Sequence, residues 1–381
     1  MRKIAILGST GSIGLQTLDE VDRHPDKFRV TALSAHSNWA LLAQQIRKYR
    51  PAAACLSGAP LPDIPEDLRF CRFYERLEDL ARESDADDVM VAVVGVAGLC
   101  ATLSARKSGK RILLANKETL VAGGELVMSA CPRVDGCPTL LPVDSEHSAI
   151  FQCLEAAGSN RLSRIFLTAS GGPFRTWDKA KIDAADVSAA LKHPTWNMGR
   201  KITVDSASMF NKALEIIEAR WLFDAEPDEI EVVIHPQSVV HSMVAFQDGA
   251  VLAQLGVPDM RVPILYAMTW PERAPSGVQP PDFALLSSLT FEKPDPSRFP
   301  SLKMSYDVLR AGGTAPCVLN AANEVAAEAF LAGSILMGQV YSIVEETLSR
   351  TAFERQDSLE TVLEADRRAR MTARSVLKEI I

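Results

Sequence analysis

The first third of the chain alternates short apolar runs with segments of helical periodicity. Between several of the runs lie helix-like segments such as residues 38–50. Near-continuous apolar runs are typical of parallel strands that are covered on both faces. They lie at residues 3–7, 29–35, 52–57, 88–95, 111–116 and 139–143. This rhythm predicts an α/β fold, with a Rossmann-like doubly wound parallel sheet over residues 1–144.

The pattern changes after residue 145 and predicts a central α+β catalytic domain over residues 145–270. Residues 164–170 and 201–205 read as strands, and residues 208–223 read as an amphipathic helix. Residues 231–256 predict antiparallel strands with a turn at Asp248 and Gly249.

Residues 170–201 are rich in Gly, Pro and Trp and are long for a loop, so we expect a lid. Residues 271–297 are rich in Pro and Ser and predict a linker. Residues 298–381 have helical periodicity throughout, which predicts a C-terminal helical bundle.

Composition and charge narrow the classes of partner. The 381 residues carry a formal net charge of −7, so no overall basic field invites nucleic acid or an anionic membrane. The chain enters a strand at once, without a signal-peptide pattern, and no apolar run approaches the ~20 residues that span a bilayer. Seven scattered cysteines favour reduced thiols over disulfides or zinc. We therefore expect a soluble, cytoplasmic protein.

Three glycines, Gly8, Gly11 and Gly14, directly follow the first predicted strand. Glycines at this place let the backbone approach a pyrophosphate, which then faces the N-terminus of the next helix. The spacing is G-x-x-G-x-x-G rather than the usual G-x-G-x-x-G, and a tight structural turn is the alternative. The expected contacts are Thr10, Ser12 and the backbone of Ile13.

The end of the second predicted strand bears on the choice of cofactor. Enzymes that prefer NAD usually carry Asp or Glu there, bonded to the ribose hydroxyls. This chain has His36, Ser37 and Asn38 after Ala35, with no acid to repel a 2′-phosphate, so NADP is favoured. A surface role is the alternative for His36.

Two carboxylates, Asp144 and Glu146, stand two residues apart where an apolar run stops. In an extended segment they would point to the same face. Like charges so close repel unless one is protonated or a cation lies between them, and oxygen ligands suit Mg²⁺ or Mn²⁺. A solvated strand end is the alternative.

A third carboxylate could come from the helix predicted over residues 208–223. Asn211 and Glu215 lie four residues apart on a polar face, with Lys212 beside them. Ser206 and Ser208 come just before, so hydroxyls, Lys212 and a helix N-terminus could together bind an anion. The alternative is a serine N-cap and a solvated lysine.

Further candidates lie at one strand end and on the predicted lid. Asn116, Lys117 and Glu118 follow the strand at residues 111–116, where α/β sheets bind ligands. His193 could donate a hydrogen bond to a substrate oxygen, and Trp196 could cover the site. A surface position is the alternative for Lys117.

Several motifs together resemble one enzyme family. They are "GSTGSIG", "LLANKE", "PVDSEHSAIFQCL", "SGGPF", "HPTWNMGRKITVDSASMFNKALEIIEA" and "VIHPQSVVHSMV". The chain is similar in these motifs to the 1-deoxy-D-xylulose 5-phosphate reductoisomerases, and the resemblance runs over nearly its whole length. The block from His193 to Glu215 is far more specific than the glycine loop.

The resemblance implies an activity and its cofactors. The family rearranges 1-deoxy-D-xylulose 5-phosphate and reduces the resulting aldehyde to 2-C-methyl-D-erythritol 4-phosphate, in non-mevalonate isoprenoid synthesis. It uses NADPH with Mn²⁺, Mg²⁺ or Co²⁺ and works as a homodimer. Whether the skeleton rearranges by a retro-aldol/aldol route or by an α-ketol shift is not decided by the sequence.

The resemblance also implies roles for residues. Metal ligands match Asp144, Glu146 and Glu215. Substrate contacts match Lys117, Ser145, Glu146, Ser170, His193, Trp196, Ser206, Asn211, Lys212 and Glu215. Cofactor contacts match Thr10, Gly11, Ser12, Ile13, Asn38, Asn116, Glu118 and Gly199, and His36 and Ser37 occupy the position beside the 2′-phosphate. Lys117, Glu146 and His193 are the candidates for catalysis, the first two as proton carriers.

One departure from the family pattern concerns the cofactor. Family members often carry a basic residue where this chain has His36 and Ser37, which weakens the argument for NADP specificity. Two other functions stay open at this point. One is another NADP-dependent, metal-assisted sugar-phosphate dehydrogenase, and the other is a binding protein that senses NADPH without turnover.

Overall fold

The structure is a computed structural model that describes residues 1–158, 160–192 and 199–381. The chain divides into two compact units, each described by itself below. The first unit comprises Met1–Thr119, Val127–Ser148 and Asp259–Val278, and the second comprises Leu120–Leu126, Ala149–Pro258 and Gln279–Ile381. The four-part division into residues 1–144, 145–270, 271–297 and 298–381 stays a prediction.

In the described part of the first unit, seven strands form a parallel sheet in the order β4-β3-β2-β1-β5-β6-β7. Their bounds are Arg2–Leu7 (β1), Phe28–Ala35 (β2), Ala53–Leu56 (β3), Arg72–Tyr74 (β4), Asp88–Val91 (β5), Arg111–Leu114 (β6) and Leu140–Pro142 (β7). The predicted doubly wound sheet is confirmed, and β4 is a strand that the hydrophobic pattern did not reveal.

The strand order reverses between β1 and β5, which lie side by side. Open α/β sheets bind ligands beyond the carboxyl ends of the strands at such a switch point. The β1 residues Ile4, Ala5, Ile6 and Leu7 are at most 1% exposed, so the loop after β1 starts from a rigid support.

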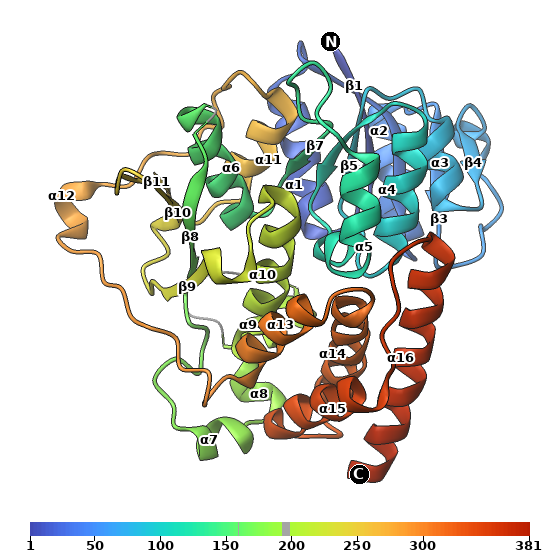
Figure 1. Cartoon of the computed structure of the whole chain (residues 1–381). Coiled ribbons are helices and arrows are strands. Elements are labelled where there is room, and N and C mark those ends of the chain that lie inside the picture. Colours follow the sequence, from blue (N-terminus) through green and yellow to red (C-terminus); the bar gives the residue numbers. More distant parts are fainter. Residues whose placement is uncertain (159, 193–198) are drawn as a thin grey trace. The chain divides into compact units, whose positions relative to one another are not determined.

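Helices of the first unit pack against this sheet (Figure 1). Helix α1 packs on α11, and α3 packs on α4. Their bounds are Ser12–Arg23 (α1), Trp39–Tyr49 (α2), Leu77–Glu83 (α3), Ala97–Lys107 (α4) and Arg261–Thr269 (α11), with a 3₁₀ turn at Glu66–Leu68. Helix α5 (Lys117–Ala130) and helix α6 (Ser145–Ala157) each begin in the first unit and continue into the second.

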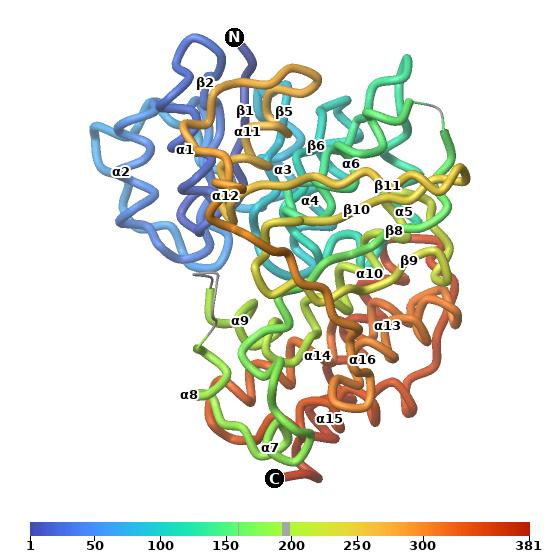
Figure 2. Tube along the Cα trace, turned by 90° about the vertical axis from the view of Figure 1, so that its left-hand side faces the viewer, coloured from blue at the N-terminus to red at the C-terminus, as the bar shows by residue number. Residues whose placement is uncertain are grey.

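Within the described residues of the second unit, four strands form a sheet in the order β11-β10-β8-β9 (Figure 2). The strands are Leu162–Ala169 (β8), Ile230–Ile234 (β9), Val240–Phe246 (β10) and Val251–Leu255 (β11). The predicted hairpin between β10 and β11 is confirmed, and Gly249 adopts a φ of 85° in its turn.

The prediction of antiparallel pairing throughout residues 231–256 was wrong for β9. This strand pairs parallel to β8. The reason is the connection, because a chain that leaves β8 and returns through helix α10 enters the sheet in the same direction.

Residues 201–205, predicted to be a strand, belong instead to helix α9 (Arg200–Ala207). The prediction was wrong because Ile202, Thr203 and Val204 are β-branched, and β-branched residues favour strands. The helix is stabilised by tertiary burial of Val204 and Ala207 and by the Thr203 hydroxyl, which donates to the Gly199 carbonyl at 2.8 Å. The next helix, α10 (Phe210–Phe223), is close to its predicted range.

The predicted C-terminal helical part is confirmed, and α14, α15 and α16 pack on one another (Figure 1). The helices are Pro300–Ala311 (α13), Ala315–Leu331 (α14), Met337–Arg350 (α15) and Leu359–Ile380 (α16). Shorter helices lie at Lys179–Asp183 (α7), Val187–Ala190 (α8) and Phe283–Leu286 (α12), with a 3₁₀ turn at Pro227–Glu229. The first two belong to the segment predicted as a lid.

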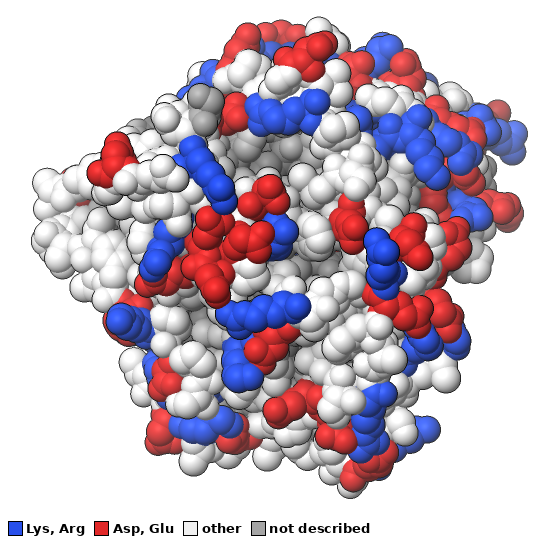
Figure 3. Space-filling view, viewed as in Figure 1, with Lys and Arg blue, Asp and Glu red and all other residues white. Residues whose placement is uncertain are grey.

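Charged side chains of both signs are interspersed on the face of the molecule in Figure 3, without a single continuous basic field. Among the described residues, we find no helix with the length and apolarity needed to cross a bilayer.

Candidate active site

The glycine loop after β1 has steric requirements at two of its three glycines. Gly8 has a φ of 88°, and a Cβ atom there would lie 2.5 Å from the Ala92 carbonyl oxygen. A Cβ atom on Gly14 would lie 2.2 Å from the Gly8 oxygen. At Gly11 the nearest such atom is 3.4 Å away, so the fold itself would accept a side chain. The missing side chain at Gly11 therefore leaves room for a ligand.

Helix α1 begins directly after this loop, with Gly11 as its N-cap. No side chain in the described part of the chain caps α1, so its first amide groups are available to an anion. The loop is held from below by Ser9, whose hydroxyl bonds the Ser34 carbonyl at 3.0 Å and the Gln45 side chain at 2.6 Å. This geometry fits a dinucleotide pyrophosphate.

The residues expected near the cofactor ribose lie exposed after β2. Asn38 caps helix α2, because its side-chain oxygen accepts from the Leu41 amide at 3.2 Å. The His36 ring packs where a side chain on residue 58 would be, since a Cβ atom on Gly58 would lie 2.0 Å from it. The roles of His36, Ser37 and Asn38 toward a cofactor stay predictions.

Asn116 forms the N-cap of helix α5. Its side-chain oxygen accepts from the Thr119 amide at 2.8 Å, and its Nδ2 donates to the Val93 carbonyl at 2.8 Å and to Glu118 at 2.7 Å. The side chain is thus already engaged with the protein, and it joins the end of β6 to the loop after β5. The prediction that Asn116 and Glu118 contact a cofactor is not tested by this geometry.

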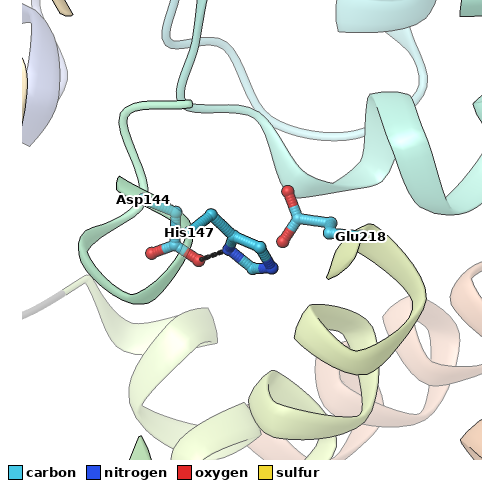
Figure 4. A group of neighbouring side chains, drawn as sticks. All are labelled: Asp144, His147 and Glu218. Atoms are coloured by element: carbon cyan, nitrogen blue, oxygen red, sulfur yellow. Dashed lines mark hydrogen bonds and ion pairs between the residues drawn. The ribbon is translucent and has the colours of Figure 1, made fainter. Parts of the chain in front are cut away.

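Asp144 lies at the carboxyl end of β7, between two basic side chains. Lys117 donates a short hydrogen bond to it, and the His147 ring donates from Nδ1 at 3.0 Å. Figure 4 shows this ring turned toward the carboxylate. Burial alone would raise the pKa of Asp144, but Lys117 and His147 outweigh it and lower that pKa far below its usual range. Asp144 is therefore ionised, as a metal ligand must be.

Asp144 and Glu146 come together, but not as an extended pair. Helix α6 begins at Ser145, so Glu146 lies in its first turn and Asp144 immediately precedes it. Carboxylate oxygens of the two residues nevertheless lie within 4.8 Å of one another. Ser145, between them, donates its hydroxyl to Glu146. The premise of an extended segment was wrong, because a helical turn brings the carboxylates together.

In the second unit, Asn211, Lys212 and Glu215 form one network on α10. Asn211 donates to one oxygen of Glu215, and Lys212 donates to the other and to the Thr168 carbonyl at the end of β8. The side chains of Lys212 and Glu215 are 4% and 1% exposed. The predicted polar face of this helix is therefore a buried, charged cluster.

The loop after β8 brings Ser170 and Ser206 close to this network. The Ser170 hydroxyl accepts from the Gly172 amide at 3.2 Å. Gly172 has a φ of 66°, and a Cβ atom there would lie 2.6 Å from the Ser206 carbonyl oxygen. Because Lys212 bonds Thr168, just before Ser170, the four residues Ser170, Ser206, Asn211 and Lys212 gather at one end of β8. We call them the phosphate-site residues, after the substrate-phosphate role that stays a prediction for them.

Three of the expected residues lie in the segment predicted as a lid. His193 and Trp196 lie outside the described residues. Gly199 is exposed and forms the N-cap of α9.

Sequence reasoning missed His147, which is fully buried against Asp144. Its position three residues after Asp144, in the first turn of a helix, was the signal that could have found it. It also missed Glu218, which is buried one turn after Glu215 on α10.

The fold and these side chains define a dinucleotide-binding α/β enzyme with carboxylates, among them the ionised Asp144, suited to a divalent cation. Three family models match the chain. They describe 1-deoxy-D-xylulose 5-phosphate reductoisomerase over residues 4–124 and the C-terminal domains of that enzyme over residues 140–223 and 255–372.

Individual relatives agree with these models. A 1-deoxy-D-xylulose 5-phosphate reductoisomerase of Cupriavidus pinatubonensis is 51% identical, over 100% of this chain and 98% of the relative. One of Phocaeicola vulgatus is 47% identical over 99% of each. A crystal structure of the reductoisomerase with NADPH, fosmidomycin and magnesium has a TM-score of 0.91 at 41% identity, over 100% of this chain and 99% of that one. The Zymomonas mobilis enzyme with NADPH has a TM-score of 0.89 at 40% identity, over 99% and 98%.

The chain belongs to the 1-deoxy-D-xylulose 5-phosphate reductoisomerase family.

Proposed function

We propose that this chain converts 1-deoxy-D-xylulose 5-phosphate to 2-C-methyl-D-erythritol 4-phosphate, with NADPH and a divalent metal ion, in non-mevalonate isoprenoid synthesis. The observation that carries the proposal is 51% identity to a relative of that name, over 100% of this chain and 98% of the relative. Related structures named as complexes with NADPH and magnesium support the two cofactors.

NADPH binding is assigned to the glycine loop and the strand ends beside it. The open N-terminus of α1 and the absence of a side chain at Gly11 suit the pyrophosphate. Thr10, Ser12 and Ile13 border that helix end, and His36, Ser37 and Asn38 follow the next strand of the sheet.

The metal ligands are assigned to Asp144, Glu146 and Glu215. Asp144 and Glu146 bring like charges within 4.8 Å, which a divalent cation neutralises, and carboxylate oxygens suit Mg²⁺ and Mn²⁺. Glu215 is held in place by Asn211 and Lys212. A bound divalent cation supplies Lewis-acid stabilisation of negative charge on the substrate oxygens.

Proton movements are assigned to Lys117 and Glu146. Lys117 is the first residue of helix α5, and its ammonium group donates a hydrogen bond to Asp144. It therefore lies at the edge of the sheet where the parallel strands have their carboxyl ends. Glu146 accepts the Ser145 hydroxyl, which gives it a fixed orientation. The proposal places the reacting carbons of the substrate along this edge, within the hydrogen-bond reach that general acid–base catalysis requires.

The phosphate group of the substrate is assigned to Ser170, Ser206, Asn211 and Lys212. Hydroxyls, an amide and a lysine are the donors that phosphate oxygens need. Since the phosphate does not react, its binding supplies remote energy for orienting the carbons that do.

The assembly is proposed to be a homodimer in the cytoplasm, with Mn²⁺ and Co²⁺ as alternatives to Mg²⁺. Strand β11 lies at the edge of its sheet, and Val251 and Leu252 on it are 50% and 37% exposed. Exposed apolar edge strands are sites of pairing with another chain. The cysteines are unpaired, which suits a reducing compartment.

The test follows NADPH absorbance with 1-deoxy-D-xylulose 5-phosphate, with and without Mn²⁺, and identifies the product by mass spectrometry. We expect substrate-dependent oxidation only when metal is present. A lack of oxidation with metal would refute the proposal. Oxidation with a different sugar phosphate alone would instead favour the alternative dehydrogenase.

Asp144→Asn tests the metal assignment, with Asp26→Asn as a matched control. Asp26 is exposed and lies in the same unit. We expect Asp144→Asn to lose turnover while it still binds NADPH, and Asp26→Asn to keep both. Normal turnover by Asp144→Asn would remove this residue from the metal site.

A further inference from the structure

A two-residue break separates α9 from α10, and it lies between the phosphate-site residues. Ser206 is in the last turn of α9, whereas Asn211 and Lys212 are in the first turn of α10. Met209, within the break, adopts a left-handed conformation with a φ of 59°. This conformation is unfavourable for a residue other than glycine, so contacts with neighbouring groups must stabilise Met209 in it. The break therefore sets how Ser206 lies relative to Lys212.

The Ser208 carbonyl at this break is held by two hydroxyl groups from distant helices. The last carbonyls of a helix have no partner within it. Ser208 accepts from the Ser301 hydroxyl of α13 at 2.7 Å and from the Tyr341 hydroxyl of α15 at 3.2 Å. Ser301 and Tyr341 are 0% and 3% exposed, so water does not replace them easily.

The last turn of α9 has a second attachment, to α14. Nδ2 of Asn323 donates to one oxygen of Asp205 at 3.0 Å, and Lys201 approaches the other at 2.6 Å. Asp205 and Asn323 are both buried. A buried carboxylate needs such donors, so this contact fixes the helix turn that carries Ser206.

Tyr341 also supports the other side of the break. Its ring stacks on Phe210, the first residue of α10, with ring centroids 5.9 Å apart and an interplanar angle of 29°. One side chain thus contacts the end of α9 through its hydroxyl and the start of α10 through its ring. A Tyr341→Phe change removes the first contact and keeps the second.

We propose that Ser301, Asn323 and Tyr341 are positioning residues, which hold the α9–α10 break in the arrangement that binds the substrate phosphate. The C-terminal helices thereby set the affinity for the phosphorylated substrate without contacting it. The proposal rests on the proposed function, because it assigns these residues to the phosphate site of that reaction.

The test compares two double variants in the full-length enzyme. Ser301→Ala with Tyr341→Phe removes both hydroxyl donors from Ser208. The matched control is Ser305→Ala with Tyr306→Phe, which removes a buried hydroxyl bonded within α13 and one bonded to the Ile230 carbonyl. Both pairs lose one serine and one tyrosine hydroxyl from the same unit.

We expect the first pair to raise KM for 1-deoxy-D-xylulose 5-phosphate about ten-fold, since a buried acceptor loses its partners. Its kcat should fall by a smaller factor than KM rises, because the phosphate contacts act mainly in binding and only in part through orienting the reacting carbons. The NADPH dissociation constant should not change. The control pair should keep all three values.

Equal KM values in the two pairs would overturn the proposal, as would a loss of NADPH affinity as large as the change in KM. If the first pair does not fold, Tyr341→Phe alone is measured against Tyr306→Phe, and a KM ratio of one overturns the proposal. A wild-type enzyme that does not turn over this substrate refutes the proposed function instead, which is a different result.

Discussion

Glu20 is a buried carboxylate whose charge the fold compensates only in part, and it predicts how stability depends on pH. The residue lies on α1, and its side chain is fully buried. Neither of its oxygens has a hydrogen-bond partner among the described residues. The Arg23 guanidinium lies 3.9 Å away, and the His24 ring nitrogen 3.7 Å away bonds the Pro275 carbonyl instead.

Burial is the main cause that raises the pKa of Glu20 from 4.5 to about 7, with Arg23 opposing it. The Arg261 guanidinium also opposes the rise, while Asp19 and Asp259 add to it. Because the pKa is higher in the folded state, that state binds the proton more tightly. This contribution to stability is full below about 4.5 and is lost as the pH rises through about 7. The rise corresponds to about 3 kcal/mol, since one pKa unit is about 1.4 kcal/mol.

Glu20→Gln replaces the carboxyl group by a neutral amide of similar shape. We expect the free energies of unfolding of variant and wild type to differ little at pH 5. At pH 8 the variant should be the more stable, by at most about 3 kcal/mol, because only the wild type then buries a charge. Urea titrations followed by circular dichroism at the two pH values measure this difference.

Asp26→Asn serves as the control, because it removes an exposed carboxylate from the same unit. Its difference from the wild type should be small and independent of pH. The reasoning about Glu20 is refuted if Glu20→Gln shows the same difference at both pH values, or if it is the less stable protein at pH 8.

Further predictions concern the glycine loop, the buried lysine and the thiols. Gly14→Ala should lower the melting temperature, since its Cβ would lie 2.2 Å from a carbonyl oxygen, whereas Gly11→Ala should keep it and weaken NADPH binding in a fluorescence titration. Lys212→Met leaves Glu215 buried without its cation, and urea unfolding without metal should show a loss of about 3–5 kcal/mol. Cys137 is the exposed thiol among the described cysteines, so Cys137→Ser should abolish the fast phase of labelling by a thiol reagent; an unchanged fast phase would contradict its exposure.

Local pattern was enough to predict the parallel sheet and the polar face of α10. Strands buried on both faces, such as Ile4–Leu7, must be apolar at nearly every position, so they stand out in the sequence. Asn211 and Glu215 share a face because helical geometry places residues four apart together. The glycines at positions 8 and 14 marked the loop in the sequence, because a side chain at either position would clash with backbone atoms.

Local pattern failed where two structures compete for the same residues. Residues 201–205 have the β-branched content of a strand, but burial of Val204 against α10 and α14 selects a helix. Asp144 and Glu146 were expected on one face of an extended segment, and the start of α6 brought them together by another geometry.

The sequence by itself determined most strands of the parallel sheet, the glycine loop and the side chains available for chemistry, because each depends on neighbours a few residues apart. Tertiary structure alone decided which partners those side chains have. Asn323 meets Asp205 across 118 residues, and Tyr341 meets Ser208 across 133. No local periodicity records such pairs, because the distance along the chain between two contacting residues is set by how the helices pack and not by the repeat of either helix.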